Sequence, residues 1–133
     1  MEASLIVCNE GEFLPEQGTH RLGAVMNQLS IPTVPHVIPL FTLAKLSYLS
    51  SSQQHFVQII AYNGQGEVVT ATEKRMVRNQ RGTHQVPGID ISFNHRVVFC
   101  DPGIHNFKLL VDDEVVAQYP LTVQVESLML QHQ

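Results

Sequence analysis

The strongest constraint on the fold is a two-residue repeat of apolar side chains near the end of the chain. From residue 115 to 125 every second position is apolar, in the order Val115, Ala117, Tyr119, Leu121, Val123 and Val125. A two-residue period is typical of a β-strand with one face in a hydrophobic core. Pro120 has no N–H for a neighbouring strand, so we expect the strand to lie at a sheet edge, to bulge or to break there.

Two hairpins are predicted from the turn residues between alternating segments. The acidic run Asp112-Asp113-Glu114 separates strands at 104–111 and 115–125, and Asn63-Gly64-Gln65-Gly66 separates strands at 55–62 and 67–72. Asn, Asp and Gly favour tight turns because they tolerate backbone conformations that other residues avoid. The two segments therefore predict four antiparallel strands.

Four further strands are expected at 3–9, 21–31, 41–49 and 89–99. In the last of these, His95 falls on the apolar face, and in 21–31 we expect Gly23 to mark a bulge or a close approach. For 41–49 a helix is the alternative, because leucines recur at positions 43, 46 and 49. The acidic segment 10–16 is expected to be a loop, and the proline-rich segment 32–39 a crossing connection that forms neither a helix nor a central strand.

About eight short strands with turn signals between them predict an all-β protein. We expect an antiparallel two-sheet β-sandwich with Greek-key or jelly-roll connections and no helix beyond a short one at 126–131. The predicted organisation is a single domain at 1–126 followed by a short C-terminal tail at 127–133.

Composition excludes several function classes. Only 15% of the 133 residues are charged, below the usual ~25%. The formal charge of −4 argues against a nucleic-acid binder that relies on a dense basic surface. The chain has neither an apolar run of membrane-spanning length nor a signal-peptide pattern at its start, so a cytoplasmic location is expected.

The sequence contains no recognisable catalytic or metal-binding motif. It has no H-x-H or C-x-x-C pair, no G-x-S-x-G and no phosphate-binding glycine loop, and we predict no cofactor. Cys8 and Cys100 each end an apolar run, which predicts two buried free thiols, with a bridge between the two strands as the alternative.

Several segments resemble a family of small uncharacterised bacterial proteins with an all-β sandwich pattern. In that family a G-x-Y/H-x-F strand precedes a V-D turn and a closing P-L-x-V strand. The matching segments here are Gly103–Phe107, Val111-Asp112 and Pro120–Val123, together with Leu5–Cys8, Arg21–Val25 and the proline-rich link into Phe41–Leu49. The resemblance implies the sandwich fold and assigns no activity.

The candidate binding residues lie in one basic stretch. Four of the eight Lys and Arg residues fall within residues 74–81, and the candidate set is Lys74, Arg75, Arg78, Arg81 and His84. Arginine forks bind carboxylates and phosphates, and long loops often carry function, so the loop 74–85 is either a solvated connection or an anion-binding site.

Three functions are weighed from these features. The first is a non-enzymatic protein-interaction module that contacts another protein, or itself as a homodimer, through its loops or its exposed sheet edges. The second is a sandwich that uses the basic loop to bind a small anionic ligand or a saccharide. The third is a cupin-like metalloenzyme, which would need histidines and carboxylates to converge in space.

Overall fold

Every named element of the computed structural model, which describes residues 1–50 and 52–126, is a β-strand. In chain order they are β1 (Glu2–Cys8), β2 (Gly11–Leu14), β3 (Thr19–Leu22), β4 (Gln28–Ile31), β5 (His36–Ser47), β6 (His55–Tyr62), β7 (Val68–Ala71), β8 (Arg75–Val77), β9 (Gly88–Phe99), β10 (Gly103–Val111) and β11 (Glu114–Val125). The all-β prediction is confirmed. The predicted number of about eight was too low, because β2, β3 and β8 are too short to show a clear alternation.

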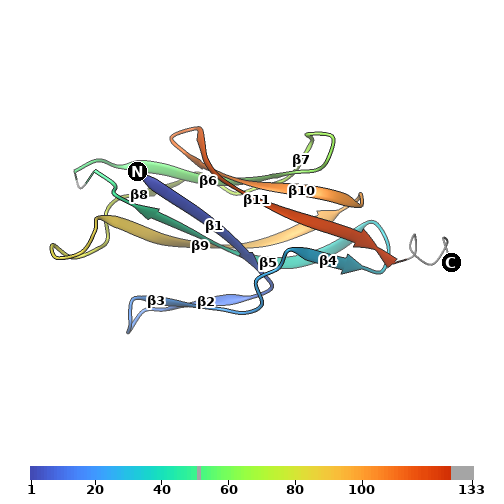
Figure 1. The fold of residues 1–133 in the computed structure, drawn as a ribbon, viewed down its shortest axis with the longest axis horizontal. Coiled ribbons are helices and arrows are strands. Elements are labelled where there is room, and N and C mark those ends of the chain that lie inside the picture. Colours follow the sequence, from blue (N-terminus) through green and yellow to red (C-terminus); the bar gives the residue numbers. More distant parts are fainter. Residues whose placement is uncertain (51, 127–133) are drawn as a thin grey trace.

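The strands form two packed sheets, as predicted (Figure 1). One sheet has the order β1-β5-β9, and the other has the order β4-β11-β10-β6-β7, with β8 also paired to β6. All pairings are antiparallel except that of β4 with β11. This strand order is that of an immunoglobulin-type sandwich. The β2–β3 hairpin lies outside it, below the three-stranded sheet in Figure 1.

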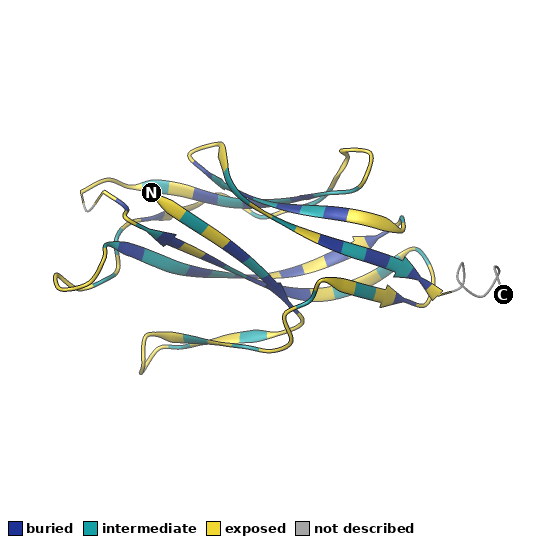
Figure 2. Ribbon diagram, viewed as in Figure 1, coloured by how far each residue is buried: buried dark blue, intermediate teal, exposed yellow. Residues whose placement is uncertain are grey.

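The core lies between the two sheets and is built from the alternating positions. Leu46 and Val97 of one sheet and Ile59, Leu109 and Val123 of the other are at most 1% exposed. Dark and light segments accordingly alternate along the strands in Figure 2. Burying each such side chain contributes roughly 1.5–3 kcal/mol, so this pattern is the main source of stability.

The segment 41–47 is a strand, so the helix alternative is wrong, and the strand both starts and ends earlier than expected. β5 runs from His36 to Ser47 as the central strand of its sheet, which corrects the prediction that 32–39 is only a connection. Pro39 is tolerated because β1 ends at Cys8, which pairs with Phe41. By the alternation of hydrogen bonds in the ladder, the nitrogen of Pro39 faces that unoccupied side.

Pro120 follows the same rule at the other sheet. It lies within β11 and pairs with Asn106 of β10, while β4 begins only at Gln28, opposite Thr122. The N–H of Thr122 donates to the Asn27 carbonyl, so two residues earlier the proline nitrogen faces a side without a strand. The prediction that Pro120 lies at a sheet edge is confirmed.

The N-terminal region differs most from expectation. The acidic segment 10–16 contains β2, and the predicted strand 21–31 divides into the end of β3, a break and β4. The close approach at Gly23 is confirmed, because a Cβ there would lie 2.4 Å from Asn9 Oδ1. Gly11 packs against the Phe41 ring, which would lie 2.5 Å from a Cβ. The hairpin thus rests on the outer face of the three-stranded sheet.

The predicted acidic turn is confirmed and is tied to the start of β6. Asp112 and Asp113 have φ values of 50° and 67°, a conformation that Asp adopts more readily than most residues. The Phe56 N–H donates to Asp112 Oδ1 at 2.9 Å, and His55 Nδ1 donates to Oδ2 at 2.7 Å. These two hydrogen bonds hold the pKa of Asp112 below its usual value.

The two cysteines are both free, so the bridge alternative is not realised. Cys8 is buried as predicted, and burial raises the pKa of its thiol. Cys100 is exposed, which corrects the prediction for that residue: it follows the last residue of β9 and points out of the sandwich. Among residues 1–50 and 52–126, no helix is long and apolar enough to cross a membrane.

Candidate functional site: an open strand edge lined by arginines

The predicted basic loop does not form one anion-binding cluster. Its residues take up different roles, because β8 occupies Arg75–Val77 and pairs with β6. Lys74 forms an ion pair with Asp113, with 2.5 Å between Nζ and Oδ1. His84 is exposed and lines neither of the two grooves described below.

Arg81 is a structural residue. Its guanidinium donates to Ser47 Oγ at 3.2 Å, to the Val86 carbonyl at 3.2 Å and to Asp90 Oδ1 at 3.1 Å. It packs against Gly88, where a Cβ would lie 2.8 Å from the guanidinium and 2.0 Å from the Leu46 carbonyl oxygen. Arg81 therefore fixes the segment 78–87 to the start of β9.

Arg75 lies along β9 and carries no carboxylate partner among the described residues. Its guanidinium donates to the Ser92 carbonyl at 3.0 Å and lies 4.3 Å from the centre of the Phe93 ring. A cation over an aromatic face is attracted by the ring quadrupole. Arg75 thus covers one backbone acceptor in the middle of β9.

Among the described residues, no strand pairs with the outer edge of β9. β9 ends the three-stranded sheet, and the segment 78–87 crosses to it from β8 without adding a strand. In immunoglobulin-type sandwiches with an ABED sheet, a fourth strand pairs at this position. The Gln80 N–H donates to the Gly88 carbonyl, so alternate residues from Gly88 onward direct their backbone outward. Beyond Gly88, these residues are Asp90, Ser92, Asn94, Arg96 and Val98.

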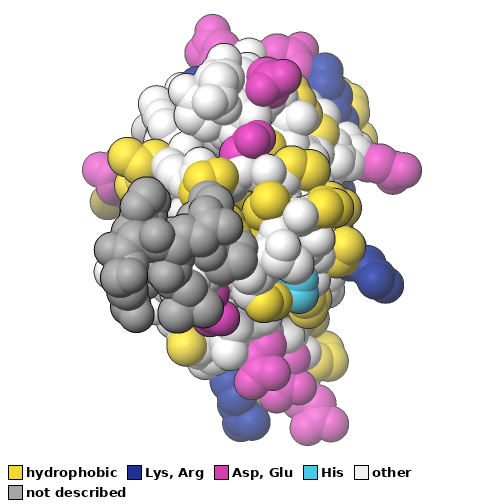
Figure 3. All heavy atoms as spheres, turned by 90° about the vertical axis from the view of Figure 1, so that its right-hand side faces the viewer, with side chains coloured by type: hydrophobic (Ala, Val, Ile, Leu, Met, Phe, Trp, Pro, Cys, Tyr) yellow, Lys and Arg dark blue, Asp and Glu magenta, His cyan; other side chains and the backbone are white. Residues whose placement is uncertain are grey.

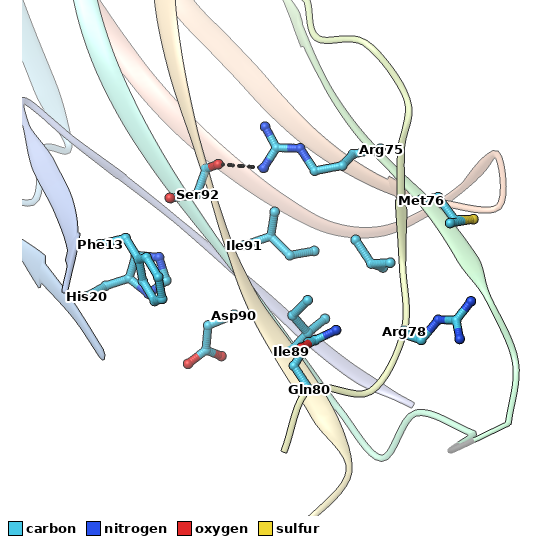
Figure 4. A pocket seen from close by; sticks show the side chains of 11 residues that line it. Phe13, His20, Arg75, Met76, Arg78, Gln80, Ile89, Asp90, Ile91 and Ser92 are labelled. Atoms are coloured by element: carbon cyan, nitrogen blue, oxygen red, sulfur yellow. Dashed lines mark hydrogen bonds between the residues drawn. The ribbon is translucent and has the colours of Figure 1, made fainter. Parts of the chain in front are cut away.

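Two grooves follow this edge. The first, of about 430 Å³, lies between the β2–β3 hairpin and the β8 segment, with Ile89–Ser92 of β9 between them. Figure 4 shows Phe13 and His20 on one side of β9 and Arg75, Met76 and Arg78 on the other. The second, of about 400 Å³, continues along Phe93–Arg96 opposite residues 70–75. Arg75 lines both grooves and connects them.

The hairpin wall is mainly aromatic. The rings of Phe13 and His20 lie 5.0 Å apart, and half of the Phe13 side chain is exposed to the groove and solvent. Burial lowers the pKa of His20, which outweighs the opposite effect of Asp90. The wall that Phe13 and His20 form is therefore uncharged near neutral pH.

Sequence reasoning identified Arg75 and Arg78 and missed most of the site. Phe13, His20, Asp90 and Arg96 are separated along the chain, and only the packing of the hairpin and β8 around β9 brings them together. The clearest available signal was Phe13, the one aromatic residue of the acidic segment 10–16. The signal of Arg96 was weaker still, because any outward strand position can hold a cation.

Two histidines of the described chain have a close polar side-chain partner. His55 and Asp112 form a hydrogen-bonded pair, but His55 Nε2 is buried without a partner and contacts no nucleophile. His95 is buried beside Thr42, with 2.7 Å between Nε2 and Oγ1, and burial lowers its pKa to about 4. Within residues 1–50 and 52–126, no three His, Cys, Asp or Glu side chains converge as metal ligands do.

Three solved structures are weakly similar to this chain. The Pseudomonas fluorescens alkylpurine DNA glycosylase AlkC, bound to DNA containing an abasic site analog, is 13% identical with a TM-score of 0.47, over 74% of this chain and 28% of that one. Two structures of β-glucosidase from Listeria innocua, with glucose and with isofagomine, are 12% identical with TM-scores of 0.44 and 0.46. They cover 77% and 93% of this chain, which spans only 15% and 16% of theirs.

The chain has no match among curated proteins. A family model, in contrast, matches residues 3–124, nearly the whole described part of the chain. The match spans both sheets, the β2–β3 hairpin and the open edge of β9. The protein therefore belongs to DUF6941, a family of unknown function.

Proposed function

We propose that this domain is a non-enzymatic protein-interaction module that binds an extended segment of a partner protein along the open edge of β9. The observation that carries the proposal is the strand position beside β9, which is unpaired and bordered by two grooves. An extended peptide added there would pair with the outward N–H and C=O groups of Asn94 and Arg96. Such backbone pairing supplies affinity, and the groove walls supply selectivity.

The alternative of a small anionic ligand held by the basic loop has less support. Such a site needs several cations directed at one point, whereas Lys74 and Arg81 are engaged by Asp113 and Asp90. Arg75 and Arg78 lie on the side of a groove that extends along the strand. A groove of this shape suits an extended chain better than a compact ligand.

Peptide selection followed by edge blocking tests the proposal. Random nine-residue peptides displayed on phage are selected on the purified chain, and the enriched peptides are measured against Asn94→Pro. Proline removes an outward N–H without removing a bond to β5, so affinity should fall about tenfold. The matched control is Ala3→Pro, on the opposite edge of the same sheet, which should bind like the native chain.

A second measurement does not depend on a variant. Hydrogen exchange by NMR should show the Asn94 and Arg96 amides slowed by bound peptide, with the Ala3 amide unchanged. The proposal fails if no peptide is enriched, or if the enriched peptides leave the exchange of both β9 amides unchanged.

A further inference from the structure

Three of the four cations without a carboxylate partner among the described residues gather at one place. In the described part of the chain, Arg21, Lys45, Lys74 and Arg81 form ion pairs. Lys108 lies 4.9 Å from the centre of the Tyr62 ring on the other sheet. The three that remain are Arg75, Arg78 and Arg96, and all three line the grooves along β9.

The carboxylates of the two grooves leave this charge uncompensated. Asp90 lies 3.1 Å from the Arg81 guanidinium and 3.7 Å from Lys45 Nζ, so two cations already neutralise it. Glu73 is the acidic residue of the second groove, and it is exposed. The edge of β9 is thus locally positive in a chain whose formal charge is −4. By contrast, the end of the molecule in Figure 3 has acidic side chains over its face and Lys or Arg only at its margin.

A strand added beside β9 would direct its side chains alternately to the two sides of the edge. One side is the uncharged wall of Phe13 and His20 (Figure 4). The other side holds the guanidinium groups of Arg75 and Arg78. Opposite-sign charges across an interface favour encounter and fix register.

We propose, on the basis of the function proposed above, that the β9 edge selects extended segments in which acidic side chains alternate with apolar ones. The acidic residues face Arg75 and Arg78, and the apolar residues face the hairpin. A nucleic acid would offer negative charge as well, but it has no backbone N–H and C=O groups to pair with the strand. An acidic polypeptide fits both features of the site.

Arg75 has a second role in this scheme. In the free protein it donates to the Ser92 carbonyl, the acceptor that an incoming backbone N–H needs. When a partner carboxylate approaches, the guanidinium moves to it, and the acceptor becomes available. Arg75 thus covers the edge in the free protein and recognises the acidic partner in the complex.

Synthetic peptides of matched shape test the charge preference. A fluorescent nine-residue peptide that alternates Glu and Val is titrated with the chain, beside versions with Gln or Lys in place of Glu. We expect the Glu peptide to bind at least about fivefold more tightly than the Gln peptide, and the preference to weaken with salt. Arg78→Gln should weaken binding of the Glu peptide about two- to fivefold, and the control Lys108→Gln should not.

The outcomes separate the two proposals. If the Gln peptide binds as tightly as the Glu peptide and slows exchange at Asn94, the acidic preference is wrong and edge binding stands. If the Glu peptide binds without slowing exchange at Asn94, edge binding is wrong as well. Tighter binding of a single-stranded oligonucleotide than of the Glu peptide overturns the choice of partner. Dimerisation that the Glu peptide does not displace would assign the edge to a second copy of the chain.

Discussion

The rest of the chain covers the two edges of the three-stranded sheet, β1 and β9, to different extents. Along the second half of β1, the Met26 N–H donates to the Val7 carbonyl and the Asn9 N–H donates to the Ala24 carbonyl. At β9 the chain satisfies only the Gly88 end, through Asn79 and Gln80. Beyond Gly88, the cover on the described part of this edge is the side chain of Arg75, which donates to the Ser92 carbonyl.

This difference indicates where the molecule can accept another strand. Unpaired strand edges promote aggregation, and proteins protect them with charges, prolines or covering segments. The second half of the β1 edge is covered by the chain itself as it crosses towards β4. On the described part of the β9 edge beyond Gly88, the cover is the side chain of Arg75, and under the proposal above its charge favours acidic strands.

The closed and open ends of β9 can be compared through two arginines of the same segment. Arg81→Ala should lower the free energy of unfolding by about 2 to 3 kcal/mol, because three hydrogen bonds from a charged group are lost. Arg78→Ala should change it by less than about 0.5 kcal/mol, since Arg78 has no partner among the described residues. Urea denaturation of both variants checks this, and equal losses would contradict the division of β9 into a closed and an open end.

The pH dependence of stability tests the packing of β9 in the core, through its buried residue His95. Burial lowers the pKa of His95 to about 4, so the folded protein favours the neutral imidazole. The contribution of neutral His95 to the free energy of unfolding is complete above the unfolded pKa of about 6.5. It is lost as the pH falls from there towards 4. Between pH 7.5 and 5 the unfolding free energy should fall by about 2 kcal/mol from this group alone.

The variant His95→Gln is the control for this prediction. Glutamine keeps an acceptor for the Thr42 hydroxyl and does not titrate, so the pH slope that belongs to His95 should disappear. Because His95 lies in β9 itself, exchange of the nearby Phe93 amide should accelerate at pH 5 more than that of Ile6 in β1. An unchanged slope in the variant would mean that another group, such as His20, produces the acid sensitivity.

Local sequence patterns predicted the parts of this molecule that depend on neighbouring residues. The alternation from 104 to 125 and the turn at Asp112 and Asp113 give the hairpin directly, because side-chain period and turn chemistry are properties of a short segment. For Pro120 the sequence predicted an edge, a bulge or a break for the same reason, and the structure realises the edge. The prediction from Pro39 was wrong, because a central strand accepts a proline at a position where one neighbouring strand, here β1, has already ended.

The candidate site was predicted only in part, because it depends on contacts between distant segments. Arg78 and Arg81 look equivalent in the sequence, yet Asp90, Ser47 and the Val86 carbonyl engage only Arg81. The missing strand beside β9 is likewise invisible in the sequence, where 67–88 appears as one strand and a loop. Both the roles of the two arginines and the missing strand depend on which sheet the segment 73–88 joins. Its strand β8 pairs with β6 and not with β9.

The smallest expected effect belongs to Lys74, which lines the second groove with its charge already paired. The Lys74–Asp113 pair is exposed, with side chains 48% and 72% accessible, so Lys74→Ala should cost less than about 0.5 kcal/mol of stability. Salt at about 1 M should remove even that difference. Affinity for the alternating Glu and Val peptide should stay within about twofold of the native value. A loss as large as that of Arg78→Gln would show that proximity to the edge, rather than the lack of a carboxylate partner, determines which cations recognise the peptide.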